Sequence, residues 1–183
     1  MLNRENSVLV IIDIQERLVL ASKYGVEVSA NMSKLAKAAD ILNIPTIVTE
    51  QYPAGLGSTT PELKNSLPLN SFTTEKSSFS AMLEPAFAEK INLLKEAGKT
   101  QIVLGGIETH ICVLQTACEL IKEGFEVYII KDACASRNKK EYKTGLELLK
   151  QYNAKISCVE IALFEWLKTS KHPNFREIQT LIK

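Results

Sequence analysis

Glycine, proline, cysteine and histidine are all scarce in this chain. Its 183 residues include eight Gly, six Pro, four Cys and two His. So few turn-forming residues argue against a turn-rich all-β fold and against low-complexity sequence. Four Cys are too few for a disulfide scaffold, and their spacing matches no paired CxxC zinc motif. We therefore expect free thiols in a reducing compartment, with the cytoplasm as the default location.

A large charge of one sign and long apolar runs are also absent. Lys and Arg total 22 against 21 Asp and Glu, which leaves a formal net charge of +1. This balance argues against nucleic acid as the main partner. The run Val8–Ile12 is too short for a signal peptide or a membrane span. With 45% hydrophobic residues, the composition predicts one globular domain over residues 1–183, with no membrane partner.

Short apolar runs alternate with amphipathic segments along the chain. Val8–Ile12 is an unbroken apolar run, as in a strand that is covered on both faces. From Val28 to Leu42, apolar residues recur every three or four positions, which predicts an amphipathic helix. The same patterns predict strands at 8–12, 46–49, 71–75, 101–104, 126–130 and 155–158, with helices at 28–42, 85–97, 109–122 and 140–152. This order predicts an α/β fold, a three-layer α/β/α sandwich around a six-stranded, parallel, Rossmann-like sheet.

Two segments depart from this alternation. Gln51–Asn70 contains three of the six Pro and two of the eight Gly, so we expect a long irregular loop, and such loops are often functional. The apolar tail from Ala162 to Lys183 predicts one or two helices packed on the outside or on a second subunit. We therefore expect at least a homodimer.

Chemically active side chains follow the predicted strands. In an open parallel sheet, ligands bind beyond the carboxyl ends of the strands. Asp13 follows the first strand, Lys76 follows the third, and Cys112 lies in the first turn of the helix after Gly106. Together they offer a base, a cation and a nucleophile, the minimum for covalent acyl transfer. We expect the helix N-terminus and the Lys76 ammonium to lower the pKa of the Cys112 thiol.

Each of these residues also has a purely structural interpretation. Asp13 is equally consistent with a cap for a helical segment near Gln15, Lys76 with a solvated lysine, and Cys112 with a buried structural thiol. The other cysteines are expected to be structural: Cys118 within a helix, Cys158 at a strand end and Cys134 in a loop, none at a helix N-terminus. The group Asp132, Ser136 and Arg137 is expected to cap and order the loop before the next helix, where Arg137 could also bind an anion.

Other chemistries find less support. His110 and Cys112 are two positions apart on a helix and point in different directions, which argues against a metal site there. Asp13-Ile14-Gln15 lacks the second Asp of an Asp-x-Asp phosphatase motif. A dinucleotide site is disfavoured because no G-x-G-x-x-G follows the first strand.

Several ordered motifs resemble the isochorismatase-like cysteine hydrolase superfamily. They cover Ile12–Gln15, Thr49–Pro53, Lys76–Ser80, Gly106–Val113 and Asp132–Arg137. Within this superfamily, the chain resembles the isochorismatase domain-containing proteins in the segment Glu50–Pro53 followed by Gly55–Gly57. The resemblance implies a catalytic triad of Cys112, Asp13 and Lys76. It also implies a cis peptide at Ile107-Glu108, with nearby amides forming an oxyanion hole, and homo-oligomeric assembly.

Departures from the family patterns narrow the expected activity. Metal-dependent nicotinamidases carry an Asp and two His after the second strand, whereas this chain has Gln51 and Tyr52 there and no His before His110. Siderophore-type isochorismatases typically lack the nucleophilic Cys. We therefore expect a hydrolase of a small amide, another C–N substrate or an ester, without metal or cofactor. Its pocket wall is expected to include Gln51, Tyr52, Leu56 and Phe79. The alternative is a catalytically silent interaction module.

Overall fold

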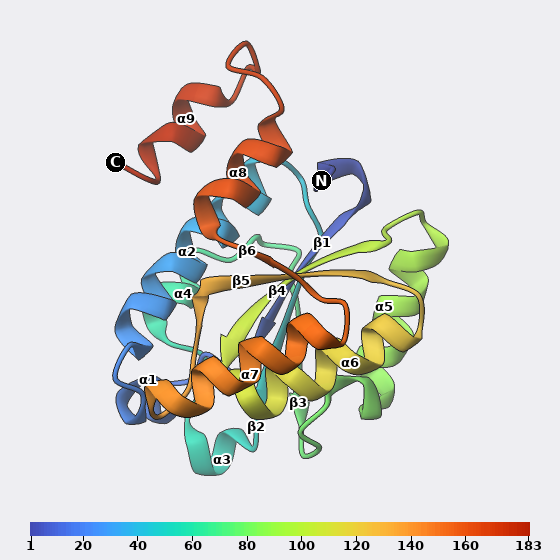
Figure 1. Cartoon of the computed structure of the whole chain (residues 1–183). Helices are drawn as coiled ribbons and strands as arrows, with labels where there is room; N and C mark the ends of the chain where they lie inside the picture. Colours follow the sequence, from blue (N-terminus) through green and yellow to red (C-terminus); the bar gives the residue numbers. More distant parts are fainter.

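A computed structural model describes residues 1–183, and one twisted sheet runs through its centre (Figure 1). The strands are β1 (Ser7–Ile12), β2 (Thr46–Gln51), β3 (Phe72–Lys76), β4 (Gln101–Ile107), β5 (Glu126–Ala135) and β6 (Lys155–Ser157). They are ordered β3-β2-β1-β4-β5-β6, and every neighbouring pair is parallel. The predicted six-stranded parallel sheet is thus confirmed.

Helices cover both faces of the sheet (Figure 1). One face carries α2 (Gly25–Ile41) and α8 (Val159–Leu167), and the other carries α5 (Pro85–Glu96), α6 (Leu114–Lys122) and α7 (Lys139–Gln151). The shorter helices are α1 (Glu16–Ala21), α3 (Pro53–Leu56), α4 (Pro61–Lys64) and α9 (Phe175–Thr180), with 3-10 turns at Arg4–Asn6 and Ala81–Leu83. None of these helices combines the length and apolarity needed to cross a bilayer.

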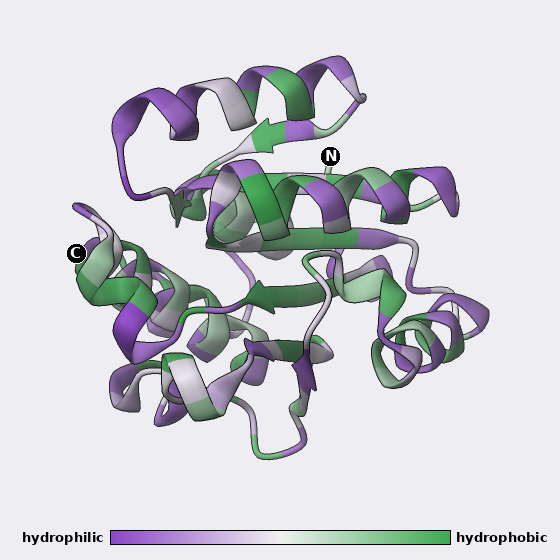
Figure 2. Ribbon diagram, turned by 90° about the horizontal axis from the view of Figure 1, so that it is seen from below, coloured by the Kyte–Doolittle hydropathy of each residue, from purple (hydrophilic) through white to green (hydrophobic).

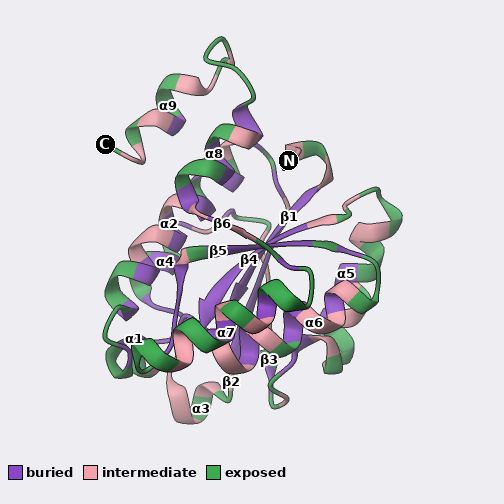
Figure 3. Cartoon of the chain, viewed as in Figure 1, coloured by how far each residue is buried: buried purple, intermediate pink, exposed green.

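The strand β1 shows why the sheet is apolar on both faces. Leu9 and Ile11 enter the core beneath α2, whereas Val8, Val10 and Ile12 enter the core on the opposite face. All five are fully buried. Each such side chain contributes about 1.5–3 kcal/mol on burial, so both layers of helices are held to the sheet by the hydrophobic effect. The central strands are accordingly coloured as hydrophobic in Figure 2 and as buried in Figure 3.

The strand β5 is longer than predicted. Pairing with β4 changes register, from Leu104 opposite Ile129 to Gly106 opposite Cys134. The polar Lys131 lies in this irregular stretch, and the apolar pattern accordingly stops at Ile130 in the sequence. Cys134 is therefore buried in a strand, and its predicted loop position is wrong.

The loop Gln51–Asn70 contains helices that were not expected, whereas the tail forms two helices, α8 and α9, within its predicted number. Gln51–Asn70 holds the one-turn helices α3 and α4, each with Pro near its start. The first helix of the tail, α8, begins at Val159 rather than at Ala162. The N–H of Val159 donates a 2.9 Å hydrogen bond to Asp132 Oδ1. Asp132 thus holds the start of α8, whereas the Asn138 side chain caps α7. Cys158 is the N-cap residue of α8, so one structural cysteine does lie at a helix N-terminus.

Candidate active site

Three strand ends meet at one edge of the sheet. The chain runs from β1 outward through β2 to β3, and from β4 outward through β5 to β6, so β1 and β4 are neighbours where the direction changes. Such a switch point is the usual ligand site of an open parallel sheet. Asp13 follows β1, and the turn that carries Cys112 follows β4. Lys76 ends β3, about 10 Å from β1 at the usual strand spacing, and a lysine side chain is long enough to bridge much of that gap.

Asp13 and Lys76 form a buried ion pair. Lys76 Nζ lies 2.7 Å from Asp13 Oδ2, and both side chains are inaccessible to solvent. Thr49 Oγ1 donates a 2.6 Å hydrogen bond to the other carboxylate oxygen of Asp13. Lys76 Nζ also donates to Gln51 Oε1 at 2.5 Å, to the Ser78 carbonyl at 3.1 Å and to the Phe79 carbonyl at 3.3 Å. These partners offset the loss of hydration that makes an unsupported buried charge unfavourable.

The backbone of Asp13 excludes the helix-cap interpretation. Asp13 adopts a left-handed conformation with φ 51°, which Asp tolerates better than most residues. The helix α1 starts at Glu16, and no side chain caps it. Gln15 N–H instead donates to the backbone carbonyl of Asp13 at 2.9 Å. The Asp13 carboxylate is therefore directed to Lys76 and Thr49.

Cys112 lies in a turn between β4 and α6. The Ile107-Glu108 peptide is cis, and Thr109–Val113 forms a π-helical turn that continues into α6. The predicted helix after Gly106 is therefore correct in extent, but its first turn is not α-helical. Cys112 is only 8% exposed, and its charged neighbours are the Asp13 carboxylate and the Lys76 ammonium.

The resting thiol is less acidic than the sequence suggests. Burial, followed by the nearby Asp13 carboxylate, raises the pKa of Cys112 to about 12, and these effects outweigh the opposing effect of Lys76. The expectation of a lowered thiol pKa is thus wrong for this arrangement. Burial also raises the pKa of Asp13, although Lys76 and Thr49 oppose the increase. A protonated thiol therefore faces a carboxylate of increased basicity.

Contacts from the end of β5 hold the turn that carries Cys112. Arg137 donates to Glu108 Oε1 from its side-chain Nε at 3.0 Å and from its backbone N–H at 3.1 Å. His110 Nδ1 lies 2.9 Å from Ser136 Oγ. Ser136 and Arg137 were expected to order the loop before α7, and both of them also contact this turn.

Of the four residues expected in the pocket wall, only Tyr52 lines the cavity next to Lys76. Gln51 contacts Lys76 directly, and Leu56 is half-buried in α3. Tyr52 is 64% exposed and Phe79 is 55% exposed. A cavity of about 460 Å³ next to Lys76 includes Tyr52 but not the other three; its lining is Tyr52, Pro53, Ala54, Glu75, Lys76, Ser77 and Glu84.

Two residues that contribute to the site, Thr49 and Gln15, were not identified from the sequence. Thr49 binds Asp13, and the buried Gln15 joins two segments near it by donating to the Gln51 carbonyl at 3.0 Å and the Gly57 carbonyl at 2.6 Å. Both belong to motifs already noted. Thr49 precedes Glu50 near the end of β2, and Gln15 lies two positions after Asp13. Because polar residues at strand ends are common, those positions alone do not reveal their partners.

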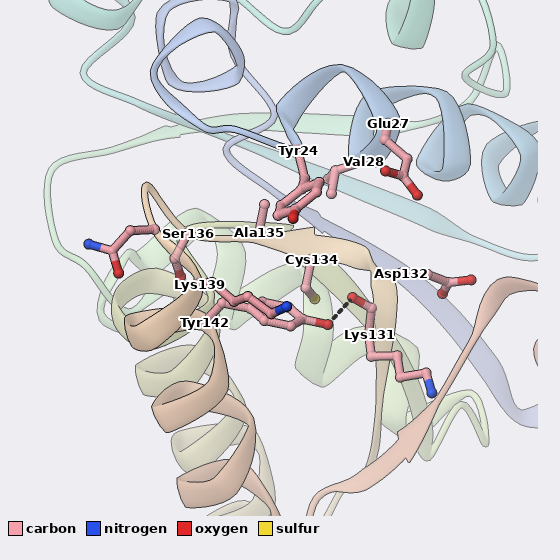
Figure 4. Close-up of a pocket in the computed structure, with 11 residues that line it drawn as sticks. Tyr24, Glu27, Val28, Lys131, Asp132, Cys134, Ala135, Ser136, Lys139 and Tyr142 are labelled. Carbon is pink, nitrogen blue, oxygen red and sulfur yellow. Dashed lines mark hydrogen bonds between the residues drawn. The ribbon is translucent and has the colours of Figure 1, made fainter.

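A second cavity lies at the end of β5 (Figure 4). Its volume is about 380 Å³, and it includes Tyr24, Cys134 and Tyr142 but none of Asp13, Lys76 and Cys112. Tyr142 donates a 2.8 Å hydrogen bond to the Lys131 carbonyl within it. No group of three or more His, Cys, Asp or Glu side chains is placed to hold a metal ion.

The Isochorismatase domain model matches residues 7–161, which include Asp13, Lys76 and Cys112. The chain belongs to the isochorismatase family. Isochorismatase domain-containing protein 2 of Danio rerio is 39% identical over 182 residues, covering 99% of this chain and 89% of the relative. The corresponding protein of Xenopus laevis is 36% identical over 181 residues, covering 99% of this chain and 85% of the relative.

Solved structures of the isochorismatase fold agree with the sheet and its helical layers. A Caenorhabditis elegans protein described as MAR1 ribonuclease superposes with a TM-score of 0.92 at 37% identity, covering 99% of this chain and 91% of that one. The Escherichia coli YcaC protein, an octameric hydrolase of unknown specificity, gives a TM-score of 0.86 at 23% identity, covering 98% and 94%. This chain therefore has the isochorismatase-family hydrolase fold.

Proposed function

We propose that this chain is a metal-independent cysteine hydrolase of a small amide or another C–N substrate, with esters as a related class. The observation that carries the proposal is the buried Asp13–Lys76 ion pair beside the Cys112 thiol, at the switch point of the sheet. An ion pair that serves only stability needs no nucleophile beside it. Here the neighbour is a nucleophilic atom, and the carboxylate has a raised pKa, which suits it to accept and return a proton.

The first half of the reaction forms an acyl-enzyme. Cys112 Sγ attacks the substrate carbonyl carbon while its proton passes to the Asp13 carboxylate, so a neutral thiol of high pKa needs no prior ionisation. Backbone N–H groups near Glu108 and Cys112 stabilise the oxyanion of the tetrahedral intermediate. When the intermediate collapses, the C–N bond breaks, Asp13 returns the proton to the leaving nitrogen, and the acyl group remains on Cys112 as a thioester.

Water completes the cycle. Asp13 accepts a proton from the attacking water, whose oxygen adds to the thioester carbonyl carbon. Collapse of this second intermediate releases the carboxylic acid and returns the proton to Cys112 Sγ. Before each proton transfer, the Lys76 ammonium favours the ionised form of Asp13 in its buried setting, and it holds the carboxylate in place.

A second candidate function is ribonuclease, favoured by the description of the Caenorhabditis elegans relative. A polyanionic substrate would have to reach a triad whose Asp13 and Lys76 side chains are fully buried, on a protein with a net charge of only +1. The affinity of a protein for nucleic acid depends largely on contacts of Lys and Arg with the phosphates. The geometry therefore favours a small uncharged carbonyl over RNA.

A substrate panel tests the choice between these activities. Purified protein would be incubated with small primary amides, ureides and esters, and separately with single-stranded RNA, with ammonia, acid and RNA fragments as readouts. The proposal expects hydrolysis of at least one amide, ureide or ester, and no RNA cleavage. RNA cleavage without carbonyl hydrolysis would replace the hydrolase proposal with the ribonuclease alternative. Inactivity across both sets would favour the interaction module.

The remaining expectations are part of the same proposal. We expect one domain over residues 1–183, a cytoplasmic location and a homo-oligomer. Ile161 and Phe164 on α8 are 51% and 39% exposed, which supports a role for this helix in self-association. Light scattering of the purified protein measures its mass in solution, and a monomer at all concentrations would contradict this part.

A further inference from the structure

The segment that leads from β3 into the first residue of the 3-10 turn Ala81–Leu83 supplies two of the four groups that bind the Lys76 ammonium. We refer to residues 77–81 as the lysine loop. The Ser78 and Phe79 carbonyls accept from Lys76 Nζ at 3.1 Å and 3.3 Å. An ammonium group is a compact point charge on a flexible stem, so its position depends on these acceptors. Movement of the lysine loop would therefore change two of the four contacts that place the cation beside Asp13 and Cys112.

Two side chains of α6 hold the lysine loop. Thr116 Oγ1 accepts a 3.0 Å hydrogen bond from the N–H of Ala81, and both residues are fully buried. Glu119 Oε2 accepts a 2.5 Å hydrogen bond from the hydroxyl of Ser80, which is 1% exposed. The Ser80 oxygen in turn accepts from the N–H of Met82 at 3.3 Å. The loop is thus tied to α6 by its backbone and by a side chain.

The start of the lysine loop is held separately. Glu84 Oε1 accepts from the N–H groups of Ser77 and Ser78 at 2.9 Å and 2.8 Å. The carbonyl groups that bind Lys76 therefore lie between one fixed point at Glu84 and another on α6. Only the second of these is on the helix that continues from the turn with Cys112.

Thr116 and Glu119 lie on the helix that continues from the turn with Cys112. The two residues are three positions apart in α6, so they lie on one side of that helix, and Cys112 lies in the π-helical turn that continues into it. We infer that Thr116 and Glu119 are positioning residues, which fix the lysine loop and thereby set the place of the Lys76 ammonium relative to Cys112 and Asp13. This inference rests on the proposed function for its effect on turnover, although its effect on the thiol can be measured without a substrate.

Paired substitutions separate positioning from simple stability. Thr116→Val keeps the shape of the side chain but removes the acceptor, whereas Thr116→Ser retains it. Glu119→Ala and Glu119→Gln form a second pair, since the amide oxygen of Gln can still accept from Ser80. Leu35→Val, in the core under α2 on the opposite face of the sheet, serves as a destabilised control that leaves the lysine loop intact.

The primary measurement is the pH midpoint of Cys112 alkylation by iodoacetamide, followed by mass spectrometry of the Cys112 peptide. Lys76 opposes the increase of the Cys112 pKa, so a displaced ammonium moves this midpoint to higher pH. We expect an upward shift in Thr116→Val and Glu119→Ala, and values near wild type in Thr116→Ser, Glu119→Gln and Leu35→Val. On a substrate from the panel, kcat would fall by about tenfold or more in the first two variants.

Two results would overturn the inference. One is an unchanged alkylation midpoint in both Thr116→Val and Glu119→Ala, because the loop would then not control the ammonium. The other is an equal shift in Leu35→Val, because general destabilisation would then explain the effect. Lack of hydrolysis by the wild-type protein would count against the proposed function, while the alkylation series would still decide the role of Thr116 and Glu119.

Discussion

Lys76 Nζ lies 2.7 Å from Asp13 Oδ2, and solvent reaches neither side chain. Removal of one partner leaves the other charge buried without compensation, which typically destabilises a protein by about 3–5 kcal/mol. We expect Lys76→Met to lower the free energy of unfolding by this amount in urea titrations. Lys37→Met, at an exposed position of α2, should change it by less than about 0.5 kcal/mol. Equal effects of the two substitutions would contradict a buried ion pair.

The causes of the raised Cys112 pKa predict the direction in which the pH midpoint of its alkylation moves on substitution. Burial and the Asp13 carboxylate both raise its pKa to about 12, so wild-type Cys112 should alkylate slowly at neutral pH. Asp13→Asn removes one of these two causes and should move the alkylation midpoint to lower pH. A midpoint that stays the same or rises in Asp13→Asn would show that the carboxylate does not face the thiol.

The same substitution should have the opposite effect on catalysis. With no carboxylate to accept the thiol proton, we expect Asp13→Asn to reduce kcat by about 10²-fold or more, although its thiol is more acidic. Steady-state kinetics on a substrate from the panel, with circular dichroism to verify folding, measures this. A folded Asp13→Asn protein with normal turnover would remove Asp13 from the mechanism.

Much of the fold follows from local sequence patterns. All six strands were predicted. The buried central strands, such as β1, are unbroken apolar runs, whereas the edge strands β3 and β6 are partly polar and were predicted from the alternation of strands and helices along the chain. The end of β5 was not predicted, because Lys131 interrupts the pattern and only pairing with β4 restores the strand. The start of α8 was also missed, because its Val159 N–H is bound by Asp132, which is 27 positions away in the sequence.

The candidate site was predictable in its residues but not in its electrostatics. Asp13, Lys76 and Cys112 were identifiable because each follows a strand at the same edge of the sheet. Their burial depends on the packing of the whole edge, which the sequence alone does not describe. A helix N-terminus and a lysine were expected to favour the thiolate, yet desolvation and the carboxylate have the larger effect on the pKa of Cys112. The roles themselves stay predictions.

Thr49 should control the acidic limb of the pH profile. Its hydroxyl donates to Asp13 Oδ1 at 2.6 Å and so lowers the pKa of Asp13. Thr49→Val removes this donor and should raise that pKa further, which moves the acidic limb of kcat/KM to higher pH. Thr49→Ser should keep the wild-type profile. A shift in both variants, or in neither, would contradict a hydrogen-bonding role for Thr49.

Gly106 is required by the close approach of β1 and β4. Its φ is +145°, and a Cβ there would lie 2.0 Å from the Ile12 carbonyl oxygen. We expect Gly106→Ala to destabilise the protein by more than about 4 kcal/mol, which is rare for a single substitution. The control Gly98→Ala has φ +86° but open space around its Cβ, so it should cost only about 1–2 kcal/mol. Similar losses in urea unfolding would contradict the steric explanation.

The role of Cys112 as nucleophile is tested most directly by turnover of the best amide from the panel in two cysteine variants. Cys112→Ala removes the attacking sulfur, whereas Cys118→Ala removes a half-buried thiol within α6. We expect Cys112→Ala to lower kcat/KM by about 10³-fold or more and Cys118→Ala to retain nearly all activity. A folded Cys112→Ala protein that hydrolyses the amide at the wild-type rate would contradict the proposed mechanism.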